Sequence, residues 1–236
     1  MATQRHAAII GGSSGIGLAT ARLLAEQGWR VTVGGRNEER LAACRDSTGA
    51  VTIQVDATDS DSLRHFYTEA GPIDALVVTV TRRGGAGPAE SLSANALLDA
   101  FAGKTAAHLE AVAFALPTLA EDGSITLVTA GSAQSALPGT AGLAAVNGAL
   151  EAAVPVLARE LAPRRVNAVS PGVIETEWWD GLPEDQRRAM FAEYAQQAPV
   201  GRNGTADDVA RAIAGMTGNG FITGVVLPVD GGLRLT

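Results

Sequence analysis

Residues 6–28 read HAAIIGGSSGIGLATARLLAEQG, and this stretch decides the fold. The run His6–Ile10 is short and apolar, which is typical of a buried strand. Gly11, Gly15 and Gly17 interrupt the apolar pattern, and apolar residues at helical spacing then continue to about residue 27. A strand, a glycine turn and a helix in this order predict the first βαβ unit of a parallel sheet.

The same alternation of apolar runs and helical patterns continues along the chain. Further strands are predicted at Arg30–Gly34, Val51–Val55, Ala75–Val80, Ser124–Thr129, Arg165–Val169 and Val225–Val229. Helices are predicted near 15–27, 38–46, 59–69, 92–101, 104–119, 141–161 and 206–217. Short links and right-handed crossovers then predict one doubly wound, Rossmann-type α/β domain over residues 1–236. Its core is a parallel seven-stranded sheet with helices on both faces.

Composition narrows the class of function. The net charge of −7 over 236 residues disfavours nucleic acid or an anionic membrane as a partner. The single cysteine, Cys44, excludes an internal disulfide and is typical of a reducing compartment. No secretory signal and no apolar run of membrane-spanning length is present, so we expect a cytoplasmic protein. His6, His65 and His108 are scattered without ligand spacing, so no metal site is expected.

The glycine turn predicts a phosphate site. Glycines let the backbone turn sharply and approach a pyrophosphate, and the N-terminus of the following helix presents free N–H groups to it. A plain glycine turn without a ligand is the alternative, which the position in the first βαβ unit disfavours. The residues predicted to contact the pyrophosphate are Gly11, Ser13, Ser14, Gly15, Ile16 and Gly17.

The spacing Gly-x3-Gly-x-Gly resembles that of the short-chain dehydrogenase/reductase family, and three later segments extend the resemblance over nearly the whole chain. They are VDATD (55–59), VNAVSPGVIET (166–176) and PVGRNGTADDVARAI…ITGVVLPVDGG (199–232). The resemblance implies a nicotinamide dinucleotide cofactor and a small-molecule substrate. The further cofactor contacts that it implies are Asp56, Ala57, Val78, Lys104, Pro171, Gly172, Val173 and Thr176.

The end of the second predicted strand indicates which dinucleotide is bound. An acidic side chain there would bind the ribose hydroxyls of NAD and repel an added phosphate. This chain reads VTVGGRNEERL, with Gly35 at the position of the acid and Arg36 after it. A guanidinium can bind a 2′-phosphate through two hydrogen bonds, which favours NADP(H) over NAD(H). The alternative is that Arg36 is only a solvated charge.

The resemblance implies an active site of four residues, Asn, Ser, Tyr and Lys, and this chain departs from that set at several positions. Leu143 occupies the tyrosine position, Asn147 the lysine position and Ala130 the serine position, with Thr129 and Ser132 beside it. Leucine cannot transfer a proton at any pH. The family's ordinary proton transfer is therefore excluded, and the proton must come from elsewhere.

The asparagine position of the tetrad holds Lys104. Compared with the family, lysine and asparagine have thus exchanged positions, with Lys104 and Asn147 on opposite sides of one polar pocket. Lys104 could there reach the nicotinamide ribose or polarise a carbonyl group. The alternative is a surface lysine at the start of a helix. The predicted catalytic residues are Lys104, Asn147 and Ser132.

Residues 177–200 read EWWDGLPEDQRRAMFAEYAQQAPV and match the insertion that covers the substrate in the family. Trp178, Trp179 and Tyr194 are predicted to bind a flat apolar substrate, and a subunit contact made by the same rings is the alternative. The small-residue faces of helices 104–119 and 141–161 resemble the family's four-helix interface. They predict a homodimer or homotetramer.

Two functions follow from these patterns. The first is an atypical NADPH-dependent carbonyl reductase of a bulky, aromatic polycyclic ketone. Its hydride comes from NADPH and its proton from a substrate hydroxyl or water. The alternative is a non-catalytic NADP(H)-binding or regulatory protein, which the loss of the tetrad favours.

Overall fold

A computed structural model describes residues 4–82 and 84–236 and contains one parallel seven-stranded sheet. This confirms the predicted fold class. The strands in spatial order are β3 (Val51–Gln54), β2 (Arg30–Gly35), β1 (His6–Ile10), β4 (Ile73–Val78), β5 (Leu119–Val128), β6 (Arg165–Pro171) and β9 (Val226–Val229). A separate two-stranded sheet joins β7 (Ile174–Glu175) to β8 (Gly204–Thr205).

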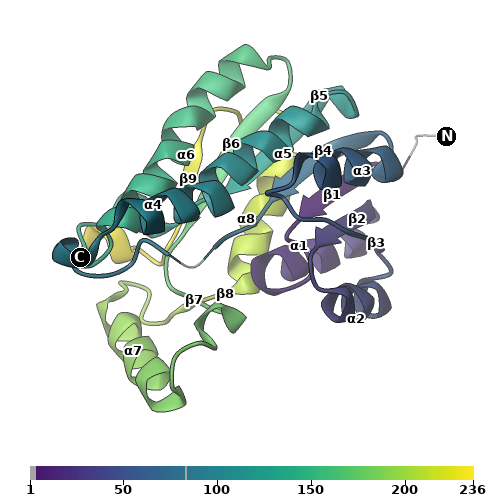
Figure 1. Cartoon of the computed structure of the whole chain (residues 1–236). Coiled ribbons are helices and arrows are strands. Elements are labelled where there is room, and N and C mark those ends of the chain that lie inside the picture. Colours follow the sequence, from purple (N-terminus) through teal and green to yellow (C-terminus); the bar gives the residue numbers. More distant parts are fainter. Residues whose placement is uncertain (1–3, 83) are drawn as a thin grey trace.

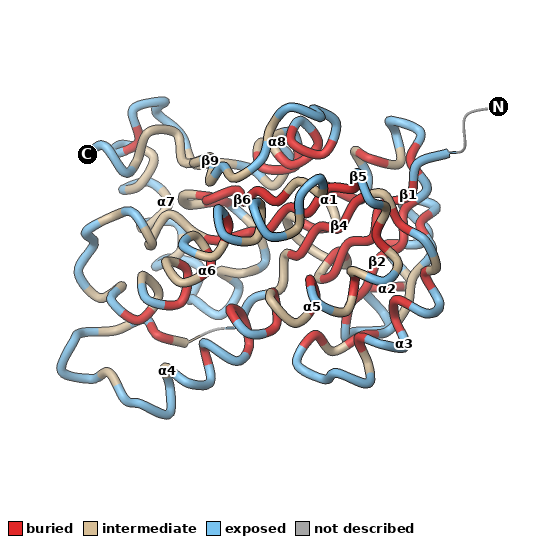
Figure 2. Tube along the Cα trace, turned by 90° about the horizontal axis from the view of Figure 1, so that it is seen from above, coloured by how far each residue is buried: buried red, intermediate tan, exposed pale blue. Residues whose placement is uncertain are grey.

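Helices cover both faces of the seven-stranded sheet (Figure 2). One face carries α1 (Gly15–Glu26), α2 (Glu38–Thr48) and α8 (Ala206–Gly218). The other carries α3 (Ser60–Ala70), α4 (Ala94–Phe101), α5 (Ala107–Ala115) and α6 (Ala141–Glu160). Short 3₁₀ turns lie at Ala89–Ser91, Gly131–Ala133, Glu177–Trp179 and Leu233–Leu235.

Alternation along the strands divides the core in two. In β1, Ala7 and Ile9 pack with the α1, α2 and α8 side, whereas Ala8 and Ile10 pack with the α3, α5 and α6 side. All four side chains are at most 1% exposed, because successive strand residues point to opposite faces and helices cover both. This is why the strand reads as a continuous apolar run.

The predicted helix over 104–119 is wrong at its C-terminal end. Helix α5 ends at Ala115, and β5 already begins at Leu119, which pairs with Ile73 of β4. The guanidinium of Arg164 donates to the backbone carbonyls of Leu116, Leu119 and Ala120 at 2.9–3.3 Å. These bonds from a distant segment hold the chain where it leaves α5 and enters β5.

The segment 177–200 contains a regular helix, α7 (Glu184–Gln197), which stands away from the main body (Figure 1). No residue of α7 is buried. Within the segment, Arg187 pairs with Asp180 at 2.7 Å. From outside the segment, the Asn203 side chain donates to the Phe191 carbonyl at 2.9 Å.

Candidate active site

The carboxyl ends of the central strands open into a cleft of about 830 Å³. Topology places it there, because the chain leaves β1 and β4 toward opposite sides and the links separate at this edge. The predicted site residues that line the cleft are Gly11, Ser13, Ser14, Gly15, Ile16, Gly17, Arg36, Asp56, Ala57, Lys104, Ser132, Asn147, Pro171, Gly172, Val173, Thr176, Trp178, Trp179 and Tyr194.

Val78 is the one predicted site residue that does not line the cleft. Its side chain is fully buried in the core on the α3, α5 and α6 side. Strand β4 ends at Val78, two residues before the end of the predicted strand, and Thr79, Val80 and Thr81 line the cleft instead. The alternation of the strand turns Val78 away from the open edge.

The glycine turn has the geometry of an anion cradle. A Cβ atom on Gly17 would lie 2.3 Å from the Gly11 carbonyl oxygen, so only glycine lets α1 approach the turn this closely. Gly15 has φ +49°, and a Cβ there would meet its nearest neighbours, on Thr176 and Glu177, at 3.6 Å. Ser14 caps α1 without a side-chain hydrogen bond, and the first turn holds no acidic residue. The free N–H groups of α1 fit a pyrophosphate.

The far end of the cleft is basic. Arg36 and Arg40 both line it, four residues apart at the start of α2. A Cβ on Gly35 would lie 2.7 Å from the Ser13 hydroxyl oxygen, so an acidic residue at this position would displace Ser13 from the turn. The sequence pattern does not single out Arg40, which lies in the first turn of α2, whereas Arg36 precedes the helix.

Asp56 lies at the same end and is held in its ionised form. Partial burial opposes its ionisation. Hydrogen bonds from the backbone N–H and the hydroxyl of Thr58, together with the charges of Arg36 and Arg82, outweigh burial and lower the pKa of Asp56 below its usual value. One carboxylate oxygen accepts both bonds, at 2.9 and 2.8 Å.

Lys104 is buried, which excludes a surface position. A π-helical turn, Ala102–Ala106, joins α4 directly to α5, where the sequence predicted a break. The widened turn directs the lysine inward, and its side chain is only 8% exposed. Lys104 Nζ donates to the Thr129 carbonyl at 3.2 Å. The Thr105 hydroxyl anchors the turn by donating to the Val146 carbonyl of α6 at 2.8 Å.

Burial lowers the pKa of Lys104 to about 8, and the charge of Glu151 works in the opposite direction. Below it, His108 Nδ1 lies 2.8 Å from the Lys104 carbonyl oxygen. Burial, followed by the charge of Lys104, lowers the pKa of His108 to about 3, so this ring is neutral. Lys104 is also the only lysine in the chain, and every other member of the 18 Lys and Arg residues is arginine.

Asn147 and Ser132 form one hydrogen-bonded unit in the cleft. Asn147 Nδ2 donates to the Leu143 carbonyl at 2.9 Å and to the Ser132 hydroxyl oxygen at 3.3 Å, which uses both amide hydrogens. Ser132 accepts in this bond, so its own hydrogen is available for a ligand. Asn147 Oδ1 is buried and has no partner among the described residues, so it offers an acceptor to a bound hydroxyl group.

Glu151 is a carboxylate one helical turn after Asn147, and the sequence pattern does not predict its role. It accepts from the Thr129 hydroxyl, the Ser170 hydroxyl and the Gln134 amide, each at 2.9 Å. The feature of the sequence that could have indicated this role is that Glu151 is the one acidic residue in the mostly apolar run NGALEAAV (147–154). Three donors hold the carboxylate in place, and Glu151 itself does not line the cleft.

The three predicted substrate aromatics lie on one side of the 177–200 segment, and Phe191 lies on the other. Trp178, Trp179 and Tyr194 line the cleft, and Trp179 Nε1 donates to the Ile174 carbonyl at 2.9 Å. Phe191 packs edge-to-face on Trp179 with ring centroids 6.1 Å apart, and it lines a second hollow.

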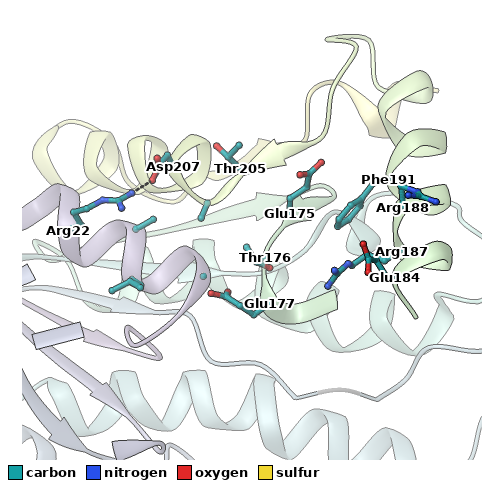
Figure 3. Close-up of a pocket in the computed structure, with 14 residues that line it drawn as sticks. Arg22, Glu175, Thr176, Glu177, Glu184, Arg187, Arg188, Phe191, Thr205 and Asp207 are labelled. Carbon is teal, nitrogen blue, oxygen red and sulfur yellow. Dashed lines mark hydrogen bonds and ion pairs between the residues drawn. The ribbon is translucent and has the colours of Figure 1, made fainter. Parts of the chain in front are cut away.

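This second hollow is an open groove of about 820 Å³ between α1, α8 and α7 (Figure 3). Arg22 of α1 and Asp207 of α8 pair across its near wall at 2.6 Å, and Glu184 and Arg187 of α7 form the far wall. Thr176 and Glu177 line both the groove and the cleft. The segment that leads into α7 therefore separates two open spaces, which explains why α7 is so little buried.

Comparison with known proteins gives matches over almost the full chain. A family model described as "Enoyl-(Acyl carrier protein) reductase" matches residues 10–234. A cis-4-hydroxycyclohexanecarboxylate dehydrogenase of Sinomonas cyclohexanicum is 34% identical, over 97% of this chain and 96% of the relative. A granaticin polyketide synthase putative ketoacyl reductase 2 of Streptomyces violaceoruber is 31% identical, over 97% and 96%. A small-chain dehydrogenase solved in complex with NADPH superimposes with TM-score 0.87 at 32% identity, covering 99% of this chain and 100% of that one.

Proposed function

Because the chain belongs to the short-chain dehydrogenase/reductase family, we propose that it is an NADPH-dependent oxidoreductase that reduces a bulky, aromatic polycyclic ketone. The observation that carries this proposal is that the glycine turn, Arg36, Arg40 and three aromatic side chains all line one cleft. A similar dehydrogenase structure contains NADPH, and two relatives are named as a dehydrogenase of a cyclic hydroxy acid and a putative ketoacyl reductase. These names support interconversion of an alcohol and a ketone.

The cofactor is held by this chain's own residues along the cleft. The N–H groups at the start of α1 bind the pyrophosphate, Arg36 and Arg40 bind the 2′-phosphate, and Asp56 lies at the adenine end. Pro171–Thr176 borders the nicotinamide end. NADPH bound in this way supplies a hydride to the carbonyl carbon of the substrate.

The substrate carbonyl lies against the Ser132 hydroxyl, whose free hydrogen polarises it, while Asn147 Oδ1 accepts from a ribose or substrate hydroxyl. Leu143 lines the cleft at the position of the family's tyrosine and has no proton to give. A substrate hydroxyl or a water molecule therefore delivers the proton to the reduced oxygen.

Deuteride transfer tests this function. NADPH labelled with deuterium at C4 is incubated with a panel of hydroxylated polycyclic ketones, and the alcohol is examined by mass spectrometry. A label on the carbinol carbon supports the reductase. Saturable NADPH binding with no labelled product from any ketone would favour the second candidate, a non-catalytic NADP(H)-binding or regulatory protein, to which Leu143 also points.

Arg36→Ala is expected to weaken NADPH binding tenfold or more, about 1.4 kcal/mol, and to leave NADH binding nearly unchanged. The reason is that only the 2′-phosphate needs the guanidinium. Calorimetric titration of both nucleotides measures the two affinities, and Arg45→Ala on the last turn of α2 is the control. Equal weakening of both nucleotides would argue against a phosphate-binding role for Arg36.

We further propose a cytoplasmic homodimer or homotetramer. Exposed apolar side chains on the α4–α6 side include Leu98 (67%) and Val156 (61%). Among helices of the described residues, α6 alone is long and apolar enough to cross a membrane, by length and composition only, and only one-third of that stretch is buried. An apolar face of this kind is also what a subunit interface needs.

Light scattering is expected to give two or four times the chain mass of 24.0 kDa for the wild type. Val156→Arg places a charge in the apolar face and is expected to shift the mass toward one chain. Thr68→Arg, on the exposed side of α3, serves as the control. A wild type that is monomeric at micromolar concentration would contradict the proposed assembly.

A further inference from the structure

The lysine of the cleft and the carboxylate beneath it form a unit that cofactor binding does not explain. Building on the proposed function, we propose that Lys104 is the terminal proton donor of the reduction and that Glu151 is the positioning residue that keeps it protonated. The substrate hydroxyl or water of the proposed function then carries the proton from Lys104 to the oxygen.

The location of the ammonium group is the first support. Lys104 Nζ donates to the carbonyl of Thr129, the last residue before the family's serine position, and Thr105 ties the same turn to α6 beside Leu143 and Asn147. The ammonium therefore lies between the end of β5 and the first turns of α6. Its bond to Thr129 uses one of its three hydrogens, and Lys104 lines the same cleft as Ser132.

The choice of residue is the second support. Arginine is the cation at every other basic position of this chain, and its guanidinium stays protonated in proteins. Lysine is the cation that releases a proton when it is desolvated. The only lysine of the chain thus occupies the one buried position where proton transfer is needed and where Leu143 cannot provide it.

Glu151 is connected to Lys104 through a single residue. The Thr129 carbonyl accepts from Lys104 Nζ, and the Thr129 hydroxyl donates to Glu151 Oε1 at 2.9 Å. With Ser170 and Gln134 also donating to it, the carboxylate acts only as an acceptor, as an ionised group does. Its negative charge counteracts the effect of burial on the pKa of Lys104.

The other ionisable groups around Lys104 do not compete with Glu151. His108, from α5, is neutral. Arg82, from the loop after β4, covers Gly103 and pairs with Asp99 of α4 at 3.0 Å, so these two charges compensate each other. Thr129 and Ser170, at the ends of β5 and β6, carry no charge. Glu151 is therefore the charged group that raises the pKa of Lys104, against the larger lowering effect of burial.

The balance of the step is simple. The carbonyl carbon takes the hydride, the π electrons move to the oxygen, and the oxygen takes one proton from the carrier hydroxyl or water. The carrier takes one proton from Lys104, which becomes a neutral amine, and solvent protonates the amine again before the next turnover. The dinucleotide leaves oxidised as NADP⁺ and the ketone leaves as an alcohol.

The test compares the pH dependence of Lys104 with that of the reaction. As the only lysine, Lys104 gives a single side-chain signal when the protein is labelled with isotopic lysine. NMR therefore measures its pKa without cofactor or turnover. We expect a pKa near 8 for the wild type, a lower pKa in Glu151→Gln because the raising effect of its charge is lost, and no change in Glu160→Gln at the exposed end of α6.

The pH profile of kcat/KM for ketone reduction is expected to follow the same values. Activity requires the protonated lysine, so it falls as the pH rises through about 8 in the wild type, and through a lower pH in Glu151→Gln. A wild-type Lys104 that titrates near the ordinary lysine value overturns the inference without any variant. The inference is also overturned if the wild type reduces ketones and the pH profile of kcat/KM is the same in Glu151→Gln. Failure of the wild type to reduce any ketone while binding NADPH instead overturns the proposed function.

Discussion

Gly17→Ala is expected to weaken NADPH binding by about 100-fold, which is equivalent to about 3 kcal/mol. The new Cβ atom would lie 2.3 Å from the Gly11 carbonyl oxygen and 2.8 Å from the Gly12 Cα, and both neighbours are backbone atoms that cannot rotate away. The glycine turn and α1 must therefore separate. One or two hydrogen bonds from N–H groups to phosphate, at about 1.5–3 kcal/mol each, are lost as a result.

The same substitution is expected to lower the free energy of unfolding by about 1–3 kcal/mol, as overpacking does. Calorimetric titration measures the binding and urea unfolding measures the stability. Gly215→Ala is the matched control, because it is exposed on α8 with no atom within 4 Å of the added Cβ. It should leave binding unchanged and stabilise the helix by about 0.5–1 kcal/mol. Normal NADPH affinity in Gly17→Ala would show that the turn does not bind the phosphates.

Lys104→Met is expected to reduce kcat for ketone reduction by about 10²–10⁴-fold, the usual contribution of a positioned acid. Methionine fills a similar volume without a proton to give. Single-turnover measurements with saturating NADPH isolate the chemical step from cofactor binding. A kcat within a few-fold of the wild type would mean that the proton comes from solvent without Lys104.

The stability of Lys104→Met gives an independent readout. The pKa of Lys104 in the native state, about 8, lies below its usual value of 10.5, so the unfolded chain binds more protons between these values. Wild-type stability therefore rises with pH in this window, and the variant lacks this rise. We expect the difference in the free energy of unfolding, variant minus wild type, to decrease by on the order of 2 kcal/mol between pH 7 and pH 9.5. Arg45→Met, an exposed cation of α2, should show no such change.

The strands and the glycine turn could be predicted because their signals are local. Apolar runs such as His6–Ile10 are buried on both faces in the structure, and glycine is required at position 17 by a contact within the same turn. The predicted cleft residues on the links after β1, β2 and β6 follow from the same rule, since the carboxyl ends of parallel strands meet at one edge.

The structure differs from the sequence-based predictions where contacts between distant segments determine the local conformation. Arg164 hydrogen-bonds the carbonyls of the link between α5 and β5, where a longer helix was predicted. Strand β4 ends at Val78, and Val78 belongs to the core. The π-turn that buries Lys104 is held by a bond from Thr105 to α6, forty-one positions away in the chain. Helical periodicity alone carries no sign of such a bond.

The sequence by itself therefore determined the sheet, the phosphate turn, the pair Gly35 and Arg36 that favours NADP(H), and the absence of a tyrosine at position 143. Each of these depends on a short pattern or on the chemistry of one side chain. Only the tertiary structure decided that Lys104 points inward and that Glu151 lies behind it. Both depend on desolvation and on hydrogen bonds that join the π-helical turn before α5, Thr129 after β5, and α6, which exist only after these elements pack.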